Sequence, residues 1–418
     1  MTGTGRRRVV VIGAGVAGLG AAHALSRVHD VEVIEGDARA GGHANTVTLA
    51  RPGGDLHLDT GFLVHNEANY PRLSRLFREL GVAVQDSDMS FGVSCRRCRV
   101  EYSAVRLWTQ PRALASPRTA RMLREVVRFM RTGYDGLDER HARSTLGDYV
   151  RIEGYSRDFR DHFVVPFAAA LWSTSPGEAL GFPMPYAVRF FDNHGLLGFR
   201  RRTWRTVAGG SRRYVAAITA PLGDRLRLGA PVRSVTRDAD GVEVRTEDDA
   251  VRRYDAAVVA THAPQALAML ADADDHERAV LGAFRTTSNS AVLHTDRAQL
   301  PARRRAWASW NYVVDDCRAP SRLPTVTYDL NRLQALDEPE RYCVTLNRDA
   351  EIDPDRVIRR ETYAHPLYTF ASLAAQARLP GLDGRRRTWF CGAYHGFGFH
   401  EDGLASGLRA AASLGAPW

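Results

Sequence analysis

The sequence predicts an α/β fold in which a nucleotide-binding domain is interleaved with a second, α+β domain. Three observations support this prediction. A strand, a glycine loop, a helix and a second strand open the chain; a strand, a glycine and a helix close it; and alternating, aromatic-rich strands lie between them. The 418 residues are enough for two domains. No repeat and no Gly/Ser-rich or Pro-rich linker stands out, so the chain is expected to cross between the domains several times.

The opening unit has the pattern of a Rossmann-like dinucleotide site. Residues 8–12 are mainly apolar and predict a buried parallel strand, which GAGVAG follows directly. Gly13 permits a tight turn, Gly15 lets a pyrophosphate approach the backbone, and Gly18 lets the helix pack closely on the strand. Glu35 ends the second strand, where a carboxylate can accept hydrogen bonds from a ribose. Because strand, helix and acid accompany the glycines, the prediction of a dinucleotide is specific.

The residues after this unit favour a flavin over a nicotinamide. In GDARAGGHANTV, the residues Arg39, Gly42 and His43 resemble the R-x-G-G-R signature of flavoproteins of the amine oxidoreductase superfamily, with His43 in place of the final arginine. The resemblance implies FAD, with these residues near its diphosphate and ribityl chain. It also implies that the loop containing Gly61 and Phe62 passes close to the flavin ring, where a glycine permits backbone approach.

The closing unit fits the same superfamily. A strand is predicted from Thr388 to Cys391, ending at Gly392, and a helix is predicted to open at Gly403. The resemblance implies that Gly392 lies beside the ribityl phosphate and that the helix points its N-terminus, with Asp402 and Gly403, at the flavin pyrimidine. Asp402 can instead cap the helix. The resemblance further assigns the backbone of Val232 to the adenine. Because the cysteine used for covalent attachment in monoamine oxidases is missing, FAD is expected to bind non-covalently.

We therefore expect a Rossmann-like FAD-binding domain interleaved with a mixed-sheet and helical substrate domain. The FAD-binding domain is assigned the discontinuous segments 1–85, 205–287 and 385–418, and the substrate domain is assigned 86–204 and 288–384. Residues 116–134 predict an arginine-rich amphipathic helix, either a surface helix with one buried stripe, which we favour, or a helix lying on a membrane. The aromatic stretch 154–176 suits either a core or the lining of an apolar cavity.

Composition excludes some chemistry and leaves some partners open. All 57 basic residues are arginine, so any mechanism that needs a lysine is excluded. The net charge of +9 fits an anionic cofactor or lipid headgroup, but the arginines are dispersed and no nucleic-acid motif is present, so nucleic acid is not expected. No apolar run is long enough to span a membrane, and a cytoplasmic protein is expected, with peripheral membrane contact left open.

The five cysteines do not suggest a disulfide framework. Cys95 and Cys98 form a CRRC pair at the tip of a predicted hairpin. A structural zinc ion needs four ligands, and no second pair follows at a suitable spacing, so no metal site is predicted.

A wider set of segments, including SDMSFGVS, WRTVAGGSRRYV, ATHAPQAL and FCGAYHGFGFHEDGL, resembles one bacterial branch of the superfamily. Its members are FAD-dependent proteins associated with cyclopropane-fatty-acid synthases and related lipid methyltransferases. The resemblance implies a small-molecule or lipid-like substrate and a lipid methyltransferase as a possible partner.

Four functions remain open on the sequence. The first is an FAD-dependent dehydrogenase or desaturase that transfers hydride from an apolar, fatty-acyl or lipid-like substrate to flavin N5. The second is a redox-neutral double-bond isomerase. The third is an amine oxidase, which the absence of lysine disfavours because many such enzymes hold a lysine near flavin N5. The fourth is a non-catalytic flavoprotein that binds a methyltransferase. The candidate acid/base residues are His400, ranked first by its place in the closing motif, and His194, His395 and Glu401.

Overall fold

The computed structural model describes residues 5–103, 116–197, 202–319 and 323–418. A five-stranded parallel sheet forms the centre of the nucleotide domain, in the order β19-β13-β1-β2-β9. Its strands come from widely separated parts of the chain: β1 (Arg8–Ile12), β2 (Asp30–Ile34), β9 (Leu226–Arg227), β13 (Ala256–Val259) and β19 (Thr388–Phe390). The expected parallel sheet, with first and last strands from the two ends of the chain, is confirmed.

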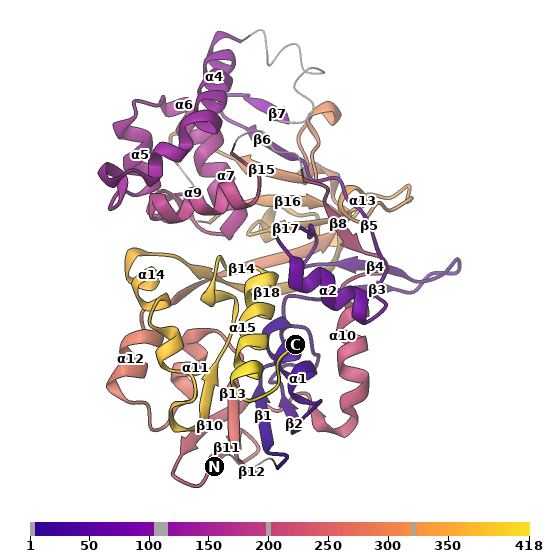
Figure 1. Cartoon of the computed structure of the whole chain (residues 1–418). Helices are drawn as coiled ribbons and strands as arrows, with labels where there is room; N and C mark the ends of the chain where they lie inside the picture. Colours follow the sequence, from indigo (N-terminus) through magenta and orange to yellow (C-terminus); the bar gives the residue numbers. More distant parts are fainter. Residues whose placement is uncertain (1–4, 104–115, 198–201, 320–322) are drawn as a thin grey trace.

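Two helices from opposite ends of the chain pack on this sheet. Helix α1 (Val16–Leu25) follows the glycine loop, and α15 (His400–Ser413) lies against it (Figure 1). A Cβ atom added at Gly407 would lie 2.0 Å from the carbonyl oxygen of Ala17, so only glycine allows the helices to approach this closely. The prediction that the last helix opens at Gly403 is wrong: the helix begins three residues earlier, at His400.

Smaller elements surround the parallel sheet. A three-stranded antiparallel sheet includes a hairpin that turns at Asp240 and Gly241. The elements of this domain and its borders are β3 (Thr46–Leu49), β4 (Leu56–Asp59), α2 (Pro71–Glu79), β5 (Val84–Asp86), β8 (Arg205–Val207), α10 (Arg212–Thr219), β10 (Val232–Arg237), β11 (Val242–Thr246), β12 (Val251–Tyr254), α11 (Ala263–Met269), α12 (Asp275–Leu281) and α14 (Phe370–Gln376).

The second domain is built on a seven-stranded mixed sheet. Its order is β18-β14-β17-β16-β15-β6-β7, and only the β15–β6 pair is parallel among the described strands. Its strands are β6 (Phe91–Cys95), β7 (Glu101–Ser103), β14 (Arg285–His294), β15 (Trp310–Val314), β16 (Val326–Asp329), β17 (Cys343–Leu346) and β18 (Val357–Leu367), and α13 (Leu330–Leu333) follows β16.

Helices cover part of the mixed sheet at the end of the molecule far from the two termini (Figure 1). They are α4 (Pro117–Thr132), α5 (Leu146–Ile152), α6 (Arg157–Phe159), a π-helical turn at Arg160–Val164, α7 (Val165–Trp172), α8 (Pro176–Leu180) and α9 (Met184–Asn193). Met122 and Phe129 of α4 are buried, whereas Arg121, Arg124 and Arg128 are exposed. This favours the surface-helix interpretation of the arginine-rich segment.

The domain borders differ in two places from those expected. Strand β14 already begins at Arg285, inside the segment assigned to the FAD-binding domain. At the other border, Ala375 of α14 and the following Leu379 and Leu382 are buried in the core of the nucleotide domain, so the chain returns there before residue 385. The burial of apolar side chains of α14 thus fixes this border. The sequence pattern did not distinguish the α14 segment from the neighbouring strand of the substrate domain.

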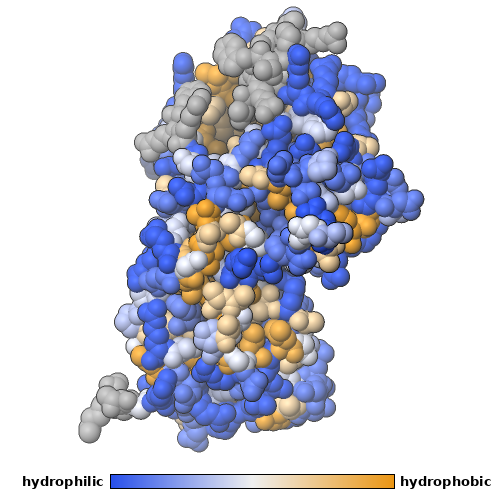
Figure 2. All heavy atoms as spheres, turned by 90° about the vertical axis from the view of Figure 1, so that its right-hand side faces the viewer, coloured by the Kyte–Doolittle hydropathy of each residue, from blue (hydrophilic) through white to orange (hydrophobic). Residues whose placement is uncertain are grey.

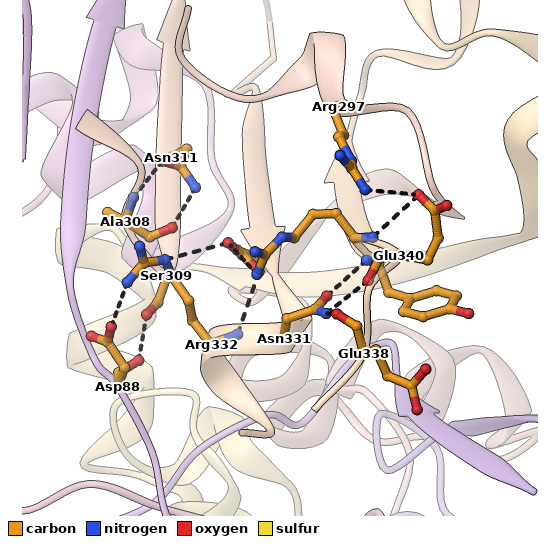
Figure 3. A network of polar contacts seen from close by, with 12 residues as sticks. Asp88, Arg297, Ala308, Ser309, Asn311, Asn331, Arg332, Glu338 and Glu340 are labelled. Carbon is orange, nitrogen blue, oxygen red and sulfur yellow. Dashed lines mark hydrogen bonds and ion pairs between the residues drawn. The ribbon is translucent and has the colours of Figure 1, made fainter. Parts of the chain in front are cut away.

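A polar network lies at the end of β16, a central strand of the mixed sheet (Figure 3). The carboxylate of Asp329, at the end of β16, accepts a hydrogen bond from Arg341 at 3.2 Å and pairs with Arg332 at 3.4 Å. Arg332 also donates to Asp88 at 2.9 Å, just before β6. Burial raises the pKa of Asp329 even with both arginines present. The network ties β16 to the segment that leads into β6, across sequence separations of more than two hundred residues.

The face of the molecule in Figure 2 is mainly hydrophilic. Figure 2 shows one face, on which hydrophobic residues gather near mid-height, at the level where the two domains meet. Within the described residues, no helix is both long and apolar enough to cross a membrane.

The α1–α15 contact predicts a strong effect of a single methyl group. Gly407→Ala should lower the free energy of unfolding by about 1–3 kcal/mol or more, because the new Cβ meets backbone that has no room to move. Gly177→Ala is the matched control. Gly177 also lies in a helix, but no atom lies within 4 Å of its added Cβ, so this variant should be neutral or stabilised by up to about 1 kcal/mol. Urea unfolding of both variants measures the difference, and equal midpoints would contradict the close contact.

Candidate functional site

A cavity of about 740 Å³ lies between the two domains. The nucleotide domain contributes the glycine loop, the end of β2 and the segment after β4, whereas the substrate domain contributes residues of α7, α9, β15, β16 and β18. The aromatic stretch 154–176 has both of the roles considered for it: Phe159 and Val164 are buried in the core, and Leu171 and Trp172 line the cavity. A cavity with residues from both domains is the expected place for a cofactor and a substrate to meet.

The three glycines of the first loop have different geometric roles. Gly13 has φ +103°, and a Cβ there would lie 2.9 Å from the carbonyl oxygen of Ala260. A Cβ at Gly18 would lie 1.9 Å from the carbonyl oxygen of Gly13, so this residue permits the close helix–strand packing expected of it and does not line the cavity. Gly15 lines the cavity and has no atom within 4 Å of an added Cβ. Its missing side chain therefore leaves space for a ligand.

The N-terminus of α1 fits an anionic group. Its N-cap residue is Gly15, which provides no side-chain cap, so the first amide groups of the helix face the cavity without an internal acceptor. Such a helix end, with a glycine at its closest point, binds the phosphates of dinucleotides. The loop with the second glycine pair lies against it: Gly15 forms a β-bridge with Gly41, and a Cβ on Gly42 would lie 3.3 Å from the Cα of Gly15.

The charged residues predicted for the cofactor line the same end of the cavity. Glu35 accepts hydrogen bonds from the backbone amides of Ala14 at 2.6 Å and Asp37 at 2.9 Å. Arg39 donates to the carbonyl oxygen of Gly42 at 2.8 Å. Val232, Gly392 and His43 also line the cavity. The glycine loops, the carboxylate and the arginine together match the donors and acceptors that a dinucleotide needs.

Gly61 and Phe62 connect this end to the substrate end. A Cβ on Gly61 would lie 2.2 Å from the carbonyl oxygen of His43, so the two loops can touch only because residue 61 is glycine. The amide of Phe62 donates to the same oxygen at 2.8 Å. The Phe62 ring stacks on the imidazole of His400, with 3.9 Å between the ring centroids. The loop therefore positions His400 at the cavity wall.

Two of the four candidate acid/base residues line the cavity. Burial, with a smaller contribution from His65, lowers the pKa of His400 to about 3. Its Nε2 atom is buried and has no hydrogen-bond partner within the described part of the chain. Burial likewise lowers the pKa of His194 to about 4, while the Nδ1 atom of His194 lies 3.0 Å from the carbonyl oxygen of Phe190. Both rings are therefore neutral near pH 7.

The side chains of the other two candidates form hydrogen bonds outside the cavity. Glu401 accepts hydrogen bonds from the backbone amides of Arg72 at 3.1 Å and Leu73 at 3.0 Å, and so caps helix α2. The Nδ1 atom of His395 accepts a hydrogen bond from Arg409 at 2.5 Å, and burial lowers its pKa to about 3. Neither side chain is among the lining residues of the cavity, so the geometry argues against acid/base roles for both.

Asp402 and Gly403 also lie outside the cavity lining. Asp402 accepts a hydrogen bond from the amide of Phe399 at 2.9 Å, which is the capping role considered for it, and burial raises its pKa to about 6. A Cβ on Gly403 would lie 2.9 Å from a methyl carbon of Val16, so Gly403 is part of the α1–α15 contact. The early start of α15 explains both positions, because it turns these residues toward the protein and His400 toward the cavity.

A cluster of four rings lines the cavity, and the sequence singled out only one of them, His43. His43 lies 4.9 Å from Tyr363, 5.3 Å from His365 and 6.2 Å from His262, measured between ring centroids. Burial and then the neighbouring His262 lower the pKa of His365 to about 4. The Nδ1 atom of His365 lies 3.1 Å from the side-chain nitrogen of buried Asn289. One signal was available: Tyr363 and His365 are two residues apart, a spacing that places both side chains on one face of a strand such as β18.

The chain belongs to the flavin containing amine oxidoreductase family, whose profile matches residues 16–414. Members of this family bind flavin and are enzymes. Among solved structures, the chain is similar to a CLA-producing fatty acid isomerase from P. acnes, with a TM-score of 0.70 and 17% identity over 98% of both chains. It is also similar to a putrescine oxidase, with a TM-score of 0.70 and 16% identity over 99% of this chain and 100% of that one. A cyclohexylamine oxidase from Brevibacterium oxydans gives a TM-score of 0.67 and 16% identity over 98% of both chains.

The open side of Gly15 leads to a test that separates cofactor binding from folding. Gly15→Val should raise the Kd for FAD at least about tenfold, because its side chain would fill the space beside the helix N-terminus. The apoprotein should keep its thermal midpoint, since the backbone of Gly15 is extended (φ −74°, ψ 179°), a conformation that valine adopts readily.

The matched control for this test is Gly53→Val. Gly53 also has no atom near an added Cβ, but it lies outside the cavity, so FAD binding should not change. Fluorescence titration of apoprotein with FAD measures both variants. Wild-type affinity in Gly15→Val would contradict a phosphate site at this loop.

Proposed function

We propose that this family member is an FAD-dependent dehydrogenase or desaturase that takes hydride from an uncharged, apolar part of a fatty-acyl or lipid-like substrate. Bound FAD would supply the hydride acceptor, flavin N5. The residues of the chain would bind the apolar substrate, orient it and exclude water.

The observation that carries this proposal is the composition of the cavity wall. In the substrate domain, the wall consists mainly of apolar and aromatic side chains, among them Met89, Leu171, Trp172, Phe190, Trp310 and Leu346. Only two carboxylates, Glu35 and Asp37, are found among the described lining residues, and both belong to the nucleotide end. Desolvating an ammonium group without a partner is costly. The wall therefore supports an apolar substrate and disfavours a primary amine.

The histidines of the wall support the same conclusion. The pKa of His400 is about 3, and those of His194 and His365 are about 4, so none carries a charge near neutral pH. A neutral imidazole can orient a polar substituent by one hydrogen bond without attracting an ion. His400 is the first candidate for this role, because its Nε2 atom has no partner within the described residues.

We also propose that FAD is held non-covalently. Cys391 is fully buried beyond the end of β19, and none of the five cysteines is among the described lining residues. Flavin would therefore depend for its retention on the glycine loops and on Glu35.

The second candidate function is redox-neutral isomerisation of a double bond. It is favoured by the similarity of the whole fold to a fatty acid isomerase, although this similarity is 17% in sequence and so extends only to the fold. The same cavity would serve both reactions, since each begins by removing hydride from an apolar chain. A non-catalytic flavoprotein that binds a lipid methyltransferase is the remaining alternative.

An anaerobic screen of the holoenzyme distinguishes these functions. Saturated and unsaturated fatty acids, phospholipids and primary amines are added in turn, and flavin absorbance is followed. We expect an apolar acyl compound to bleach the flavin, with a product two hydrogens lighter by mass spectrometry. A product of unchanged mass would replace desaturation with isomerisation. Bleaching by amines alone would overturn the proposal. Because isomerisation returns the hydride and leaves the flavin oxidised, only the absence of both bleaching and product would favour the non-catalytic alternative.

His400→Phe tests the proposed role of the imidazole. Phenylalanine keeps a ring to stack on Phe62 but removes both ring nitrogens, so FAD should be retained while flavin reduction slows about tenfold or more. In wild type, reduction should show no titration near pH 6.5, because the pKa of His400 is held near 3.

His395→Phe is the control, since His395 lies outside the cavity lining and its replacement should leave the reduction rate unchanged. Stopped-flow spectroscopy measures all three proteins. Equal rates in wild type and His400→Phe would show that the imidazole has no part in the reaction.

A further inference from the structure

A second group of reactive side chains lies in the substrate domain, away from the flavin cavity. It consists of Cys95, Cys98, His162 and Cys317. One ligand atom from each, three sulfurs and an imidazole nitrogen, can be chosen so that all four lie within 4.8 Å of one another. The closest printed pair is Cys98 Sγ and His162 Nε2, at 3.1 Å. None of the four residues lines the cavity between the domains.

Three separate segments bring these side chains together. Cys95 ends β6, and Cys98 lies in the turn before β7. His162 lies in the π-helical turn between α6 and α7, and Cys317 follows β15, the parallel neighbour of β6. In the sequence, the CRRC pair lacks two of the four ligands that a structural zinc ion needs. The fold supplies both of them, one from 64 residues away along the chain in the case of His162.

We propose that these four residues bind one structural zinc ion. Zinc in structural sites is held tetrahedrally by four cysteine or histidine ligands, with Zn–S near 2.3 Å and Zn–N near 2.0–2.1 Å. Such bond lengths place neighbouring ligand atoms roughly 3.5–3.8 Å apart. The Cys98–His162 separation of 3.1 Å is shorter than this range and no pair exceeds 4.8 Å, so shifts of about an ångström in the side chains complete the tetrahedron. Three soft thiolates and one imidazole favour zinc over magnesium or calcium.

The hydrogen bonds around His162 are those expected of a histidine that binds a metal ion. Its Nδ1 atom lies 3.2 Å from the carbonyl oxygen of Asp158, so that Nδ1 carries the hydrogen and Nε2 presents a lone pair to the cysteines. The side chain of Asp158 pairs with Arg118, and the hydroxyl of Tyr102 donates to the carbonyl oxygen of His162 at 2.8 Å. These contacts hold the ring in one orientation before any metal binds.

The surroundings of the cysteine pair fit equally well. The amide of Cys95 donates to the carbonyl oxygen of Val100 at 2.7 Å, and the amide of Arg99 donates to the carbonyl oxygen of Cys95 at 3.0 Å. Arg99 has φ +60°, a left-handed conformation that closes this turn. A zinc ion with three thiolates has a net charge of −1, and the guanidinium of Arg118 is close enough to Cys98 and Cys317 to interact with their charges.

A disulfide bond explains the cluster less well than a zinc ion does. It would use two of the sulfurs and leave the third thiol and the imidazole nitrogen facing the same point. All five cysteines of the chain are free in the structure. A zinc ion uses all four groups at once and needs no oxidant.

The position of the site indicates what the metal does. It joins the β6–β7 hairpin, the loop after β15 and the turn that leads into α7. The last residues of α7, including Leu171 and Trp172, line the flavin cavity. With four protein ligands the site has no open position for a substrate, so the metal is structural. It would hold the helix that forms one wall of the substrate pocket.

Metal analysis of the full-length holoprotein, expressed with added zinc and purified without chelator, tests the proposal. We expect about one zinc ion per chain, and at least roughly tenfold less in Cys98→Ser and in Cys317→Ser. Cys343→Ala is the matched control, since Cys343 is a buried cysteine outside the cluster and its replacement should leave the zinc content unchanged. FAD content is measured in parallel to verify that each variant is folded.

Cobalt exchange and thiol labelling give independent readouts on wild-type protein. Cobalt(II) should produce the visible ligand-field and thiolate charge-transfer bands of a tetrahedral site. The half-buried Cys98 and Cys317 should react with a thiol reagent only after chelator is added. Zinc-free protein from zinc-supplemented cells would overturn the proposal. So would zinc that persists in the Cys98→Ser/Cys317→Ser double variant, or a disulfide among the three cysteines found by mass spectrometry.

Discussion

The close contact between α1 and α15 is the constraint on which the site depends. The two helices come from opposite ends of the chain, and Gly407 lets the backbone of α15 approach the carbonyl oxygen of Ala17. Helix α1 carries the glycine loop at its N-terminus, and α15 carries His400 at its own. Because both N-termini point to the cavity, their contact fixes the distance between the phosphate end and the substrate end. Flavoenzyme chemistry requires such fixed geometry, since the protein contributes mainly position and charge.

Burial determines the charge of the histidine side chains in the wall of this cavity. Its wall contains several histidines, which in water would be partly charged near neutral pH. Removal from water lowers the pKa values of His400, His194 and His365 far enough that all are neutral. The end of the cavity formed by the substrate domain therefore behaves as an uncharged pocket although it contains titratable groups. Burial also raises the pKa of Asp402, the carboxylate that caps α15, to about 6.

Sequence reasoning succeeded where a constraint is local. The geometry of Gly13, Gly15 and Gly18 follows from a single strand–turn–helix unit, whose spacing can be read directly from the chain. Reasoning about Glu401 failed because a shift of three residues in the start of α15 changes its direction. Successive helical residues point about 100° apart, so His400 faces the cavity while its neighbour caps α2.

Long-range assembly could not be derived from spacing. His262 and His365 come from separate segments, one after a parallel strand and one within an antiparallel strand, and only the packing of two domains brings both of them beside His43. The cysteine cluster depends on the same kind of assembly. Cys317 reaches Cys95 because β15 pairs in parallel with β6, the one parallel pair among the described strands of that sheet. A search for a second C-x-x-C pair therefore tested the wrong pattern.

The two sites are connected mechanically through one helix. The π-helical turn that contains His162 continues without a break into α7, and α7 ends at the cavity wall with Trp172. Near its end, α7 is also fixed from the other side, because the indole nitrogen of Trp172 donates to the carbonyl oxygen of Phe397 at 3.3 Å. That carbonyl lies in the segment just before α15. The wall of the substrate pocket is therefore held at one end by the cysteine cluster and at the other by the helix that positions His400. A displacement at either end of α7 would change the shape of the pocket. The stability of the substrate domain would therefore affect which substrate the pocket selects.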